Sequence, residues 1–223
     1  MRRLYVLRPE PGATATVERA KAMGLDAVAM PLFAIEPVAW TVPDPRDFDS
    51  LLLTSANALR EAGDGLSALR SLTVLSVGEP TAAAARDAGF EVVNVGQGGV
   101  DDLLTRVAPD MRLLHLCGEH RRIPANAPQH IASIAVYRSR ALPAPAVEAL
   151  RGEVAVVHSA RAAARLRELA DGALRATIRL AAISGAAVVV AGDGWDELEV
   201  AAKPNDRDLL ALAARLCQKP EPK

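Results

Sequence analysis

The chain has 223 residues, of which 50% are hydrophobic and only 3% aromatic, and its formal net charge is −1. This charge disfavours a nucleic-acid-binding protein, which usually has a basic excess, and the absence of any apolar run of about 18 residues disfavours a membrane span. The two cysteines provide no disulfide framework, so we expect a soluble cytoplasmic enzyme or binding protein with one large or two small domains.

The first elements in chain order are predicted from apolar runs and from the breakers between them. Leu4–Leu7 is typical of a strand, and the helix that follows runs to Met23, with Thr14 or Thr16 as its expected cap. Asp26–Phe33 is expected to form the second strand. Ile35–Trp40 continues extended, and Pro43–Pro45 indicates a linker.

The middle of the chain alternates strands with helices. Leu51–Leu53 is an unbroken apolar run, which suits a strand buried on both faces in a parallel sheet. An alanine-rich helical pattern follows at once, from Asn57. Further strands are expected at Thr73, Glu91, Arg112 and Ile131–Tyr137, and further helices at Thr81 and Asp101.

The last third of the chain repeats this alternation after a polar, proline-bearing linker at Arg138–Pro145. Strands are expected at Val154, Arg179 and Glu199, and helices at Arg161, Ala186 and Asp208. Residues 219–223 are expected to form a frayed tail.

Two parts of the chain share one pattern. Thr54-Ser55 and His158-Ser159 each follow an apolar run and precede an alanine-rich helix. The opening residues 4–33 resemble residues 112–137, and residues 154–216 resemble residues 51–106. A repeat of this length indicates two copies of a small α/β domain and not a solenoid.

The displaced order of the repeat predicts that one domain is inserted in the other. We expect residues 1–36 and 141–223 to form a discontinuous domain 1 and residues 45–135 to form the inserted domain 2. Residues 37–44 and 136–140 are expected to join the domains as a two-stranded linker. Each domain is expected to contain a flavodoxin-like parallel sheet, with a cleft between the domains. Such clefts, and the carboxyl ends of parallel strands, are usual ligand sites.

Hydroxyl side chains are found at several strand-to-helix turns. Ser55, Ser159, Ser184 and Thr81 each stand at the start of a predicted helix, where a hydroxyl can cap the helix. The same turns present backbone N–H groups and the positive end of a helix dipole to an anion. From the residues alone, capping is the favoured interpretation and anion binding the alternative.

Two other patterns are weaker. His115 and Cys117 share a strand face close to His120, but the spacing of a structural zinc site is absent, and we expect no metal. Gly96–Gly99 lacks the GxGxxG fingerprint and follows the third strand of its segment. A nucleotide-dependent enzyme is therefore disfavoured.

Six short motifs resemble motifs of the uroporphyrinogen-III synthase family, and they occur in the same order along the chain. The resemblance covers nearly the whole chain, and the ordered set together with the insertion is more specific than any single motif. The motifs are Leu7–Pro11, Leu53–Ala58, Val77–Ala82, Gly96–Gly99, Val136–Arg138 and His158–Arg161.

The resemblance implies that hydroxymethylbilane, a linear tetrapyrrole, is cyclised to uroporphyrinogen III with loss of water and inversion of ring D. It also implies that no metal or organic cofactor takes part, and we expect a monomer. The substrate carries many carboxylates, so its site should offer many hydrogen-bond donors, which the strand-to-helix turns supply. A non-catalytic two-domain binding protein for a small polyanionic ligand is the alternative.

The resemblance also suggests roles for single residues. From the residues alone Tyr137 is an aromatic side chain that closes the sheet edge, whereas the resemblance makes it the expected proton donor to the departing hydroxyl and Thr81 a second catalytic candidate. Arg8 is either a surface arginine near a helix start or a bidentate clamp for a substrate carboxylate. Ala186-Ala187 stand where relatives often have a threonine, so no catalytic hydroxyl is expected there. Further clamp candidates are Arg121, Arg122, Arg138 and Arg161. The expected substrate-binding set is completed by Ser55, Asn57, Gly78, Gly118, Ser159 and Ser184.

Overall fold

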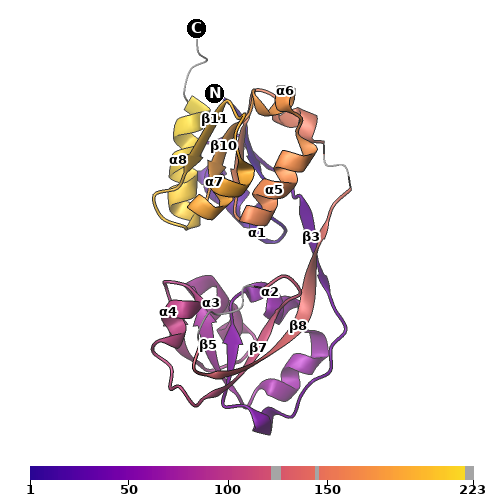
Figure 1. Cartoon of the computed structure of the whole chain (residues 1–223), viewed down its shortest axis with the longest axis vertical. Coiled ribbons are helices and arrows are strands. Elements are labelled where there is room, and N and C mark those ends of the chain that lie inside the picture. Colours follow the sequence, from indigo (N-terminus) through magenta and orange to yellow (C-terminus); the bar gives the residue numbers. More distant parts are fainter. Residues whose placement is uncertain (122–126, 144–145, 219–223) are drawn as a thin grey trace. The chain divides into compact units, whose positions relative to one another are not determined.

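The computed structural model describes residues 1–121, 127–143 and 146–218. The chain divides into two compact units (Figure 1). Unit 1 comprises Met1–Ala34 with Ala141–Lys223, and unit 2 comprises Ile35–Arg140. The chain passes from one unit to the other in strands β3 (Phe33–Pro37) and β8 (His130–Ala141). Residues 136–140, which we expected to be a linker, therefore continue strand β8.

The sheet of unit 1 has five strands in the order β11-β10-β9-β1-β2, and all its pairings are parallel. The central strand β9 is wholly buried, as its apolar sequence requires when helices cover both faces. The strands are β1 (Leu4–Val6), β2 (Ala27–Ala29), β9 (Val154–Val157), β10 (Arg179–Ala182) and β11 (Glu197–Val200).

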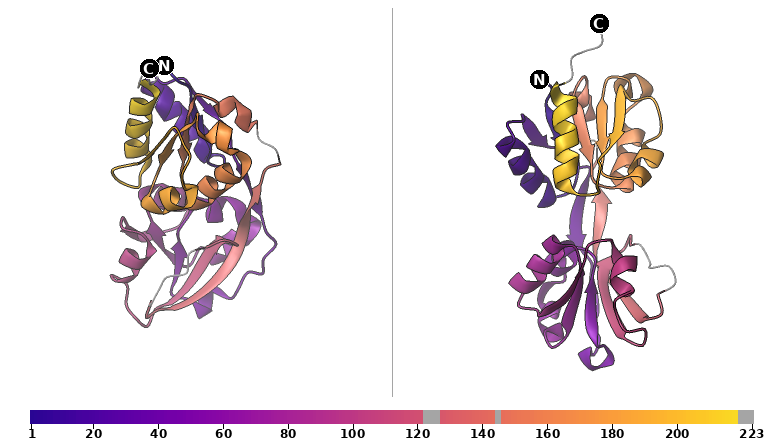
Figure 2. Two further views of the ribbon diagram at one scale, coloured as in Figure 1. Left: turned by 45° about the horizontal axis from the view of Figure 1, so that its top comes forward. Right: turned by 90° about the vertical axis from the view of Figure 1, so that its left-hand side faces the viewer.

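Helices cover both faces of this sheet (Figure 2). Side chains of α1 and α8 pack on one face with Leu4 and Val6. Side chains of α5 and α7 pack on the other face with Tyr5 and Leu7, because successive strand residues point to opposite faces. The helices are α1 (Gly12–Ala22), α5 (Ala160–Leu169), α6 (Gly172–Arg175), α7 (Gly185–Ala191) and α8 (Asp206–Gln218), with a 3-10 turn at Val147–Leu150.

Unit 2 has a six-stranded sheet in the order β3-β8-β7-β4-β5-β6. The pairings from β8 to β6 are parallel. Its remaining strands are β4 (Ser50–Leu53), β5 (Thr73–Val77), β6 (Val92–Gly96) and β7 (Arg112–Gly118). Its helices are α2 (Ala56–Glu61), α3 (Glu79–Asp87) and α4 (Val100–Leu104), with 3-10 turns at Pro45–Asp47 and Gly63–Leu69.

The two sheets confirm the α/β fold and the displaced repeat that the sequence predicts. In unit 1 the order from β2 is β2-β1-β9-β10-β11, and in unit 2 the order from β8 is β8-β7-β4-β5-β6. Strands β1 and β2 therefore correspond to β7 and β8, while β9, β10 and β11 correspond to β4, β5 and β6. The pairs of segments that resemble each other in sequence occupy equivalent places in the two sheets.

Some boundaries differ from the sequence-based expectation. Helix α1 begins at Gly12, and Thr16 lies on its buried face, so neither Thr14 nor Thr16 caps that helix. Helix α8 begins at Asp206 and includes Arg207, two residues before the predicted start. The helix expected after β7 falls partly on residues 122–126, and the expected frayed tail on residues 219–223, both outside the described residues.

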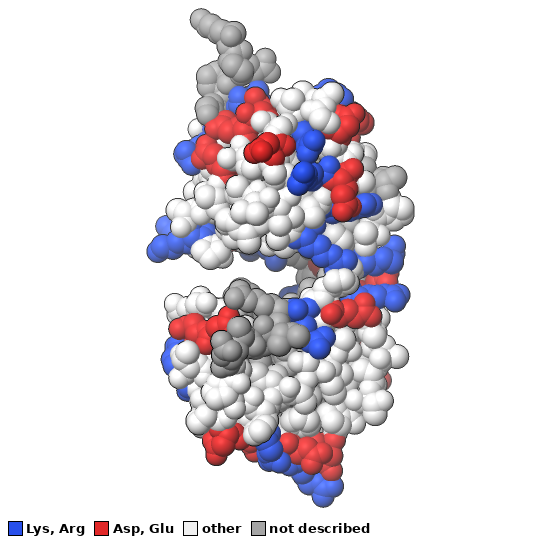
Figure 3. Space-filling model, viewed as in Figure 1, with Lys and Arg blue, Asp and Glu red and all other residues white. Residues whose placement is uncertain are grey.

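Basic and acidic side chains are interspersed over the face of each unit seen in Figure 3. Many of them form exposed ion pairs, such as Arg86 with Glu79 at 2.6 Å and Arg112 with Asp49 at 2.7 Å. This distribution agrees with the net charge of −1. Within the part of the chain that the structure describes, every helix is too short or too polar to cross a membrane.

Candidate functional site

Ser55 and Asn57 lie at the carboxyl end of strand β4. Ser55 is extended, and its Oγ accepts a hydrogen bond from the backbone N–H of Asn57 at 3.2 Å. The Oδ1 of Asn57 accepts from Arg60 at 3.1 Å. Ser55 is therefore an N-cap in this structure, which is the role that its place before a helix favours.

Gly78 and Thr81 lie at the carboxyl end of the neighbouring strand β5. Gly78 has φ of 79°, a conformation that favours glycine, and its N–H donates to the carbonyl of Gly96 at 2.8 Å. Thr81 is in the first turn of α3 and is only 5% exposed. Its backbone N–H donates to the carbonyl of Gly78 at 3.1 Å. Both residues thus shape the start of α3.

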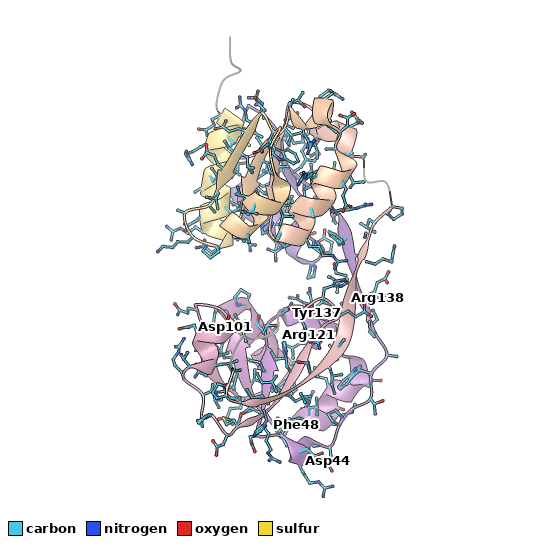
Figure 4. The ribbon with its side chains drawn as sticks, in the orientation of Figure 1. Asp44, Phe48, Asp101, Arg121, Tyr137 and Arg138 are labelled. Carbon is cyan, nitrogen blue, oxygen red and sulfur yellow. The ribbon has the colours of Figure 1, made fainter. Side chains whose placement is uncertain are left out.

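Tyr137 and Gly118 lie side by side at the carboxyl end of β7, where Gly118 pairs with Tyr137 in the sheet. The half-buried ring of Tyr137 lies directly against Gly118, and its backbone carbonyl accepts from the N–H of Glu119 at 2.9 Å. Figure 4 shows Tyr137 and Arg121 at the same end of unit 2, opposite to Asp44. This end of the unit is where the parallel strands β4, β5 and β7 terminate.

The arginines near Tyr137 differ in their partners. Arg138 forms an ion pair with Glu36 at 3.2 Å, and Arg140 contacts the same carboxylate at 2.5 Å. These two contacts lower the pKa of Glu36, with the hydrogen bond from Arg140 as the main cause. Arg121 is exposed. Arg122, a further candidate, lies outside the described residues.

His115 is buried in the middle of strand β7, below this end of the sheet. Its Nε2 lies 3.2 Å from the Oγ1 of Thr54 and its Nδ1 lies 3.4 Å from the Oγ of Ser133. Burial, with a smaller contribution from the nearby charge of Arg121, lowers the pKa of His115 to about 4. His115 is thus a neutral core residue that links three strands. In residues 1–121, 127–143 and 146–218, no three metal-ligating side chains come together.

We expect the stability of the protein to depend on the protonation of His115. Its pKa falls from 6.5 to about 4 on folding. The free energy of unfolding is therefore highest above pH 6.5 and decreases as the pH drops through the window from 6.5 to about 4. The shift corresponds to a loss of about 3 kcal/mol. Urea unfolding of the wild type and of His115→Asn at both ends of the window measures it. A loss of the same size in the variant would contradict the assignment to His115.

Ser159 and Ser184 follow strands β9 and β10 in unit 1. The Oγ of Ser159 accepts from the N–H of Ala162 at 3.1 Å and caps α5. Ser184 is extended and precedes α7, but its side chain makes no capping hydrogen bond. Arg161, in the first turn of α5, lies over the ring of Phe33 at 4.5 Å. Ser55 and Ser159 thus act as helix caps, whereas the side chain of Ser184 does not.

Arg8 belongs to a polar network in unit 1 whose centre the sequence did not reveal. The Oδ1 of Asp206 accepts from the Nε2 of His158 at 2.7 Å and from the Oγ1 of Thr16 at 3.1 Å. Its Oδ2 accepts from the Nε of Arg19 at 2.7 Å, and the Nη1 of Arg8 lies 3.8 Å from Oδ1. A Cβ on Gly12 would meet the guanidinium of Arg8.

The charges of this network depend on burial. Burial alone would raise the pKa of Asp206, but the hydrogen bonds from His158 and Arg19 outweigh it, and the pKa lies well below its usual range. Burial lowers the pKa of His158, and Asp206 only partly offsets this effect. The Nδ1 of His158 is buried and has no hydrogen-bond partner among the described residues. The sequence does not predict the contact between His158 and Asp206, because the two residues are far apart in the chain.

The predicted site residues thus fall into two sets. One set stands at the carboxyl edge of the unit 2 sheet and comprises Ser55, Asn57, Gly78, Thr81, Gly118 and Tyr137. The other set stands at the carboxyl edge of the unit 1 sheet and comprises Arg8, Ser159 and Ser184. Each edge collects hydroxyls, backbone N–H groups and helix starts, which are suited to anionic groups.

A parallel α/β protein of two units, with polar turns at the carboxyl edge of each sheet, is of the class that binds its ligand at strand ends. A family model described as uroporphyrinogen-III synthase HemD matches residues 14–211. The chain belongs to this family, as its ordered motifs indicate. Membership of this family makes the protein a cyclising lyase of tetrapyrrole biosynthesis.

Solved structures agree with the fold. The uroporphyrinogen-III synthetase of Helicobacter pylori matches with a TM-score of 0.70 and 17% identity, over 97% of this chain and 100% of that chain. A mutant uroporphyrinogen III synthase of Thermus thermophilus matches with a TM-score of 0.55 and 19% identity, over 98% of this chain and 100% of that chain. No curated protein matches this chain.

Proposed function

We propose that the chain takes hydroxymethylbilane as its substrate and cyclises it to uroporphyrinogen III, with loss of water and inversion of ring D. Membership of the family supports the reaction. The carboxyl edges of the two sheets support the substrate class, because they present hydroxyls, N–H groups and helix starts that can bind carboxylates without a large net charge.

Tyr137 is the proposed proton donor to the departing hydroxyl. It is one of only two tyrosines, and the other, Tyr5, is 7% exposed in the core of unit 1. Tyr137 stands half-buried beside Gly118 at the carboxyl end of β7, at the end of unit 2 where Figure 4 also shows Arg121. Its place at this edge is the observation that carries the assignment.

Arg8 is the proposed carboxylate clamp of unit 1, and the network around Asp206 holds its guanidinium. Ser184 and the N–H groups at the start of α5 are proposed as further donors there. In unit 2, Ser55, Asn57, Gly78 and Gly118 are proposed to contribute mainly through the backbone, and Thr81 as a secondary catalytic group. Binding is thereby divided among many weak donors.

Because binding is divided in this way, we expect Ser55→Ala and Thr81→Ala each to have a small effect on catalysis. Each should lower kcat/KM by less than about tenfold, since a neighbouring donor replaces part of the loss. Ser55→Ala should also destabilise α2 by about 1 kcal/mol through the lost cap. Steady-state kinetics and urea unfolding measure the two effects. A loss of 10³-fold or more for Thr81→Ala, on the scale of about 10²–10⁴ for a general acid, would make it a principal catalytic group.

The reaction is tested by supplying hydroxymethylbilane and identifying the product isomer. Uroporphyrinogen I forms without enzyme, so formation of isomer III is the diagnostic result. A non-catalytic protein for polyanionic ligands would bind the bilane or the product and yield isomer I alone. That outcome would reject the proposed substrate conversion while leaving the fold as described.

We further propose that the protein acts as a monomer in the cytoplasm and without a metal or organic cofactor. Cys117 and Cys217 are both buried free thiols, in agreement with a reducing compartment. Full activity after dialysis against a chelator tests the absence of a metal, and full activity of protein refolded from denaturant without additions tests the absence of an organic cofactor. Light scattering of the active protein tests the monomer.

A further inference from the structure

The register between strands β7 and β8 changes at the level of Tyr137. Cys117 pairs with Ala135, but Gly118 pairs with Tyr137, so Val136 is an extra residue in β8. Such a bulge re-aims the side chains that follow it. Ile134 and Val136 pack in the same apolar cluster as Tyr137, whereas strict alternation would point Tyr137 to the opposite face from both.

The re-aimed ring lies against the Cα of Gly118. A Cβ built on Gly118 would be 2.8 Å from both Cε2 and Cζ of Tyr137 and 3.1 Å from its hydroxyl oxygen. These distances are well below the roughly 3.5–4.0 Å separation of carbon atoms in contact. The atoms that a side chain would displace belong to the hydroxyl end of the ring, which is the end that carries the transferable proton.

The backbone at Gly118 does not itself need glycine. Gly118 is a strand residue whose φ is outside the left-handed region, unlike Gly78 with φ of 79°. The chain around Tyr137 is fixed, because its carbonyl accepts from Glu119 and the preceding Val136 is 0% exposed. A side chain on Gly118 would therefore move the phenol ring and not the strands.

We propose that Gly118 is a positioning residue for Tyr137: the absence of a side chain at Gly118, together with the bulge in β8, places the phenol hydroxyl for proton donation. This inference rests on the proposed role of Tyr137 as proton donor. It adds a steric task to the backbone contribution to substrate binding that is proposed for Gly118.

The test compares Gly118→Ala with the matched control Gly172→Ala. Gly172 also has no positive φ, and no atom lies within 4 Å of a Cβ built on it. We expect Gly118→Ala to lower kcat by about 10²-fold, the scale of a misplacement of about 1 Å, with KM nearly unchanged. The control should keep the wild-type kcat.

A double variant separates positioning of the hydroxyl from other effects. In a Tyr137→Phe chain there is no hydroxyl to position, so adding Gly118→Ala should lower kcat by less than about threefold. An equal loss in both backgrounds would show that Gly118 acts on something other than Tyr137 and would overturn the inference. A wild-type kcat for Tyr137→Phe would instead reject the proton donor, and the inference with it.

Folding is followed in the same variants. If Gly118→Ala does not fold, Gly118→Ala with Tyr137→Ala removes the ring that the new methyl group would meet. Recovery of the wild-type circular dichroism spectrum in this pair supports the contact between the two residues. Failure of the pair to fold, while Tyr137→Ala alone folds, would overturn the inference.

Discussion

Tyr137→Phe is expected to lower kcat by about 10²–10⁴-fold, the usual contribution of a general acid, and still to yield isomer III. The substrate is reactive enough to lose its hydroxyl and close unaided, so the enzyme must above all select which carbon of ring D is attacked. Holding the reacting ends together can contribute on the order of 7–11 kcal/mol. A single acid contributes about 3–5 kcal/mol.

The control for this variant is Tyr5→Phe, the same chemical change at the other tyrosine. Tyr5 packs in the core of unit 1, so this change should leave kcat within about twofold of the wild type. Product isomers are separated by chromatography at matched conversion. If Tyr137→Phe gave only isomer I while product binding stayed intact, Tyr137 would itself direct the inversion, and the division between positioning and acid catalysis would be wrong.

Asp206→Ala is expected to destabilise the protein by about 2–4 kcal/mol, the largest change in stability that we predict for a single substitution. The substitution leaves the buried Nε2 of His158 without its acceptor and removes the counter-charge of Arg8 and Arg19. A buried donor that loses its partner costs about 1–3 kcal/mol, and an unpaired charge adds to this cost. The side chains of Arg8 and Arg19 are 35% and 52% exposed, so solvent reduces their share.

Asp208→Ala is the matched control, because Asp208 lies in the same first turn of α8 but its side chain accepts an exposed hydrogen bond from Asn205. It should cost less than about 1 kcal/mol. The pKa of Asp206 is lowered on folding, so its stabilising effect is present above pH 3.8 and disappears as the pH falls below that value. Equal losses for the two variants in urea unfolding at neutral pH would contradict the central place of Asp206.

The sequence predicts much of the fold because the strands are short apolar runs separated by clear turns. The equivalence of residues 4–33 with 112–137 and of residues 154–216 with 51–106 corresponds to the strand orders of the two sheets. The predicted linker segment 136–140 lies in the 12-residue strand β8, which continues past its predicted end at Tyr137 to Ala141. The alternation of large and polar residues in β8 does not predict at which residue the chain passes from unit 2 to unit 1.

The site is only partly predictable, because side-chain partners depend on contacts between distant parts of the chain. Ser55 and Ser159 follow from their place before helices, and both are N-caps. Arg8 was singled out, but its partner Asp206 is remote in sequence and joins it only through the packing of α8 beside α1. The contact of Tyr137 with Gly118 depends on a bulge that no turn residue marks.

The most direct measurement of the central claim is the isomer composition formed from hydroxymethylbilane as the enzyme concentration is raised. Unaided closure to isomer I competes with the enzyme, so the account predicts that the fraction of isomer III rises with enzyme concentration and approaches unity. In Tyr137→Phe the same fraction should be reached at a proportionally higher concentration. A product that remains isomer I at every concentration of folded wild-type protein would contradict the account.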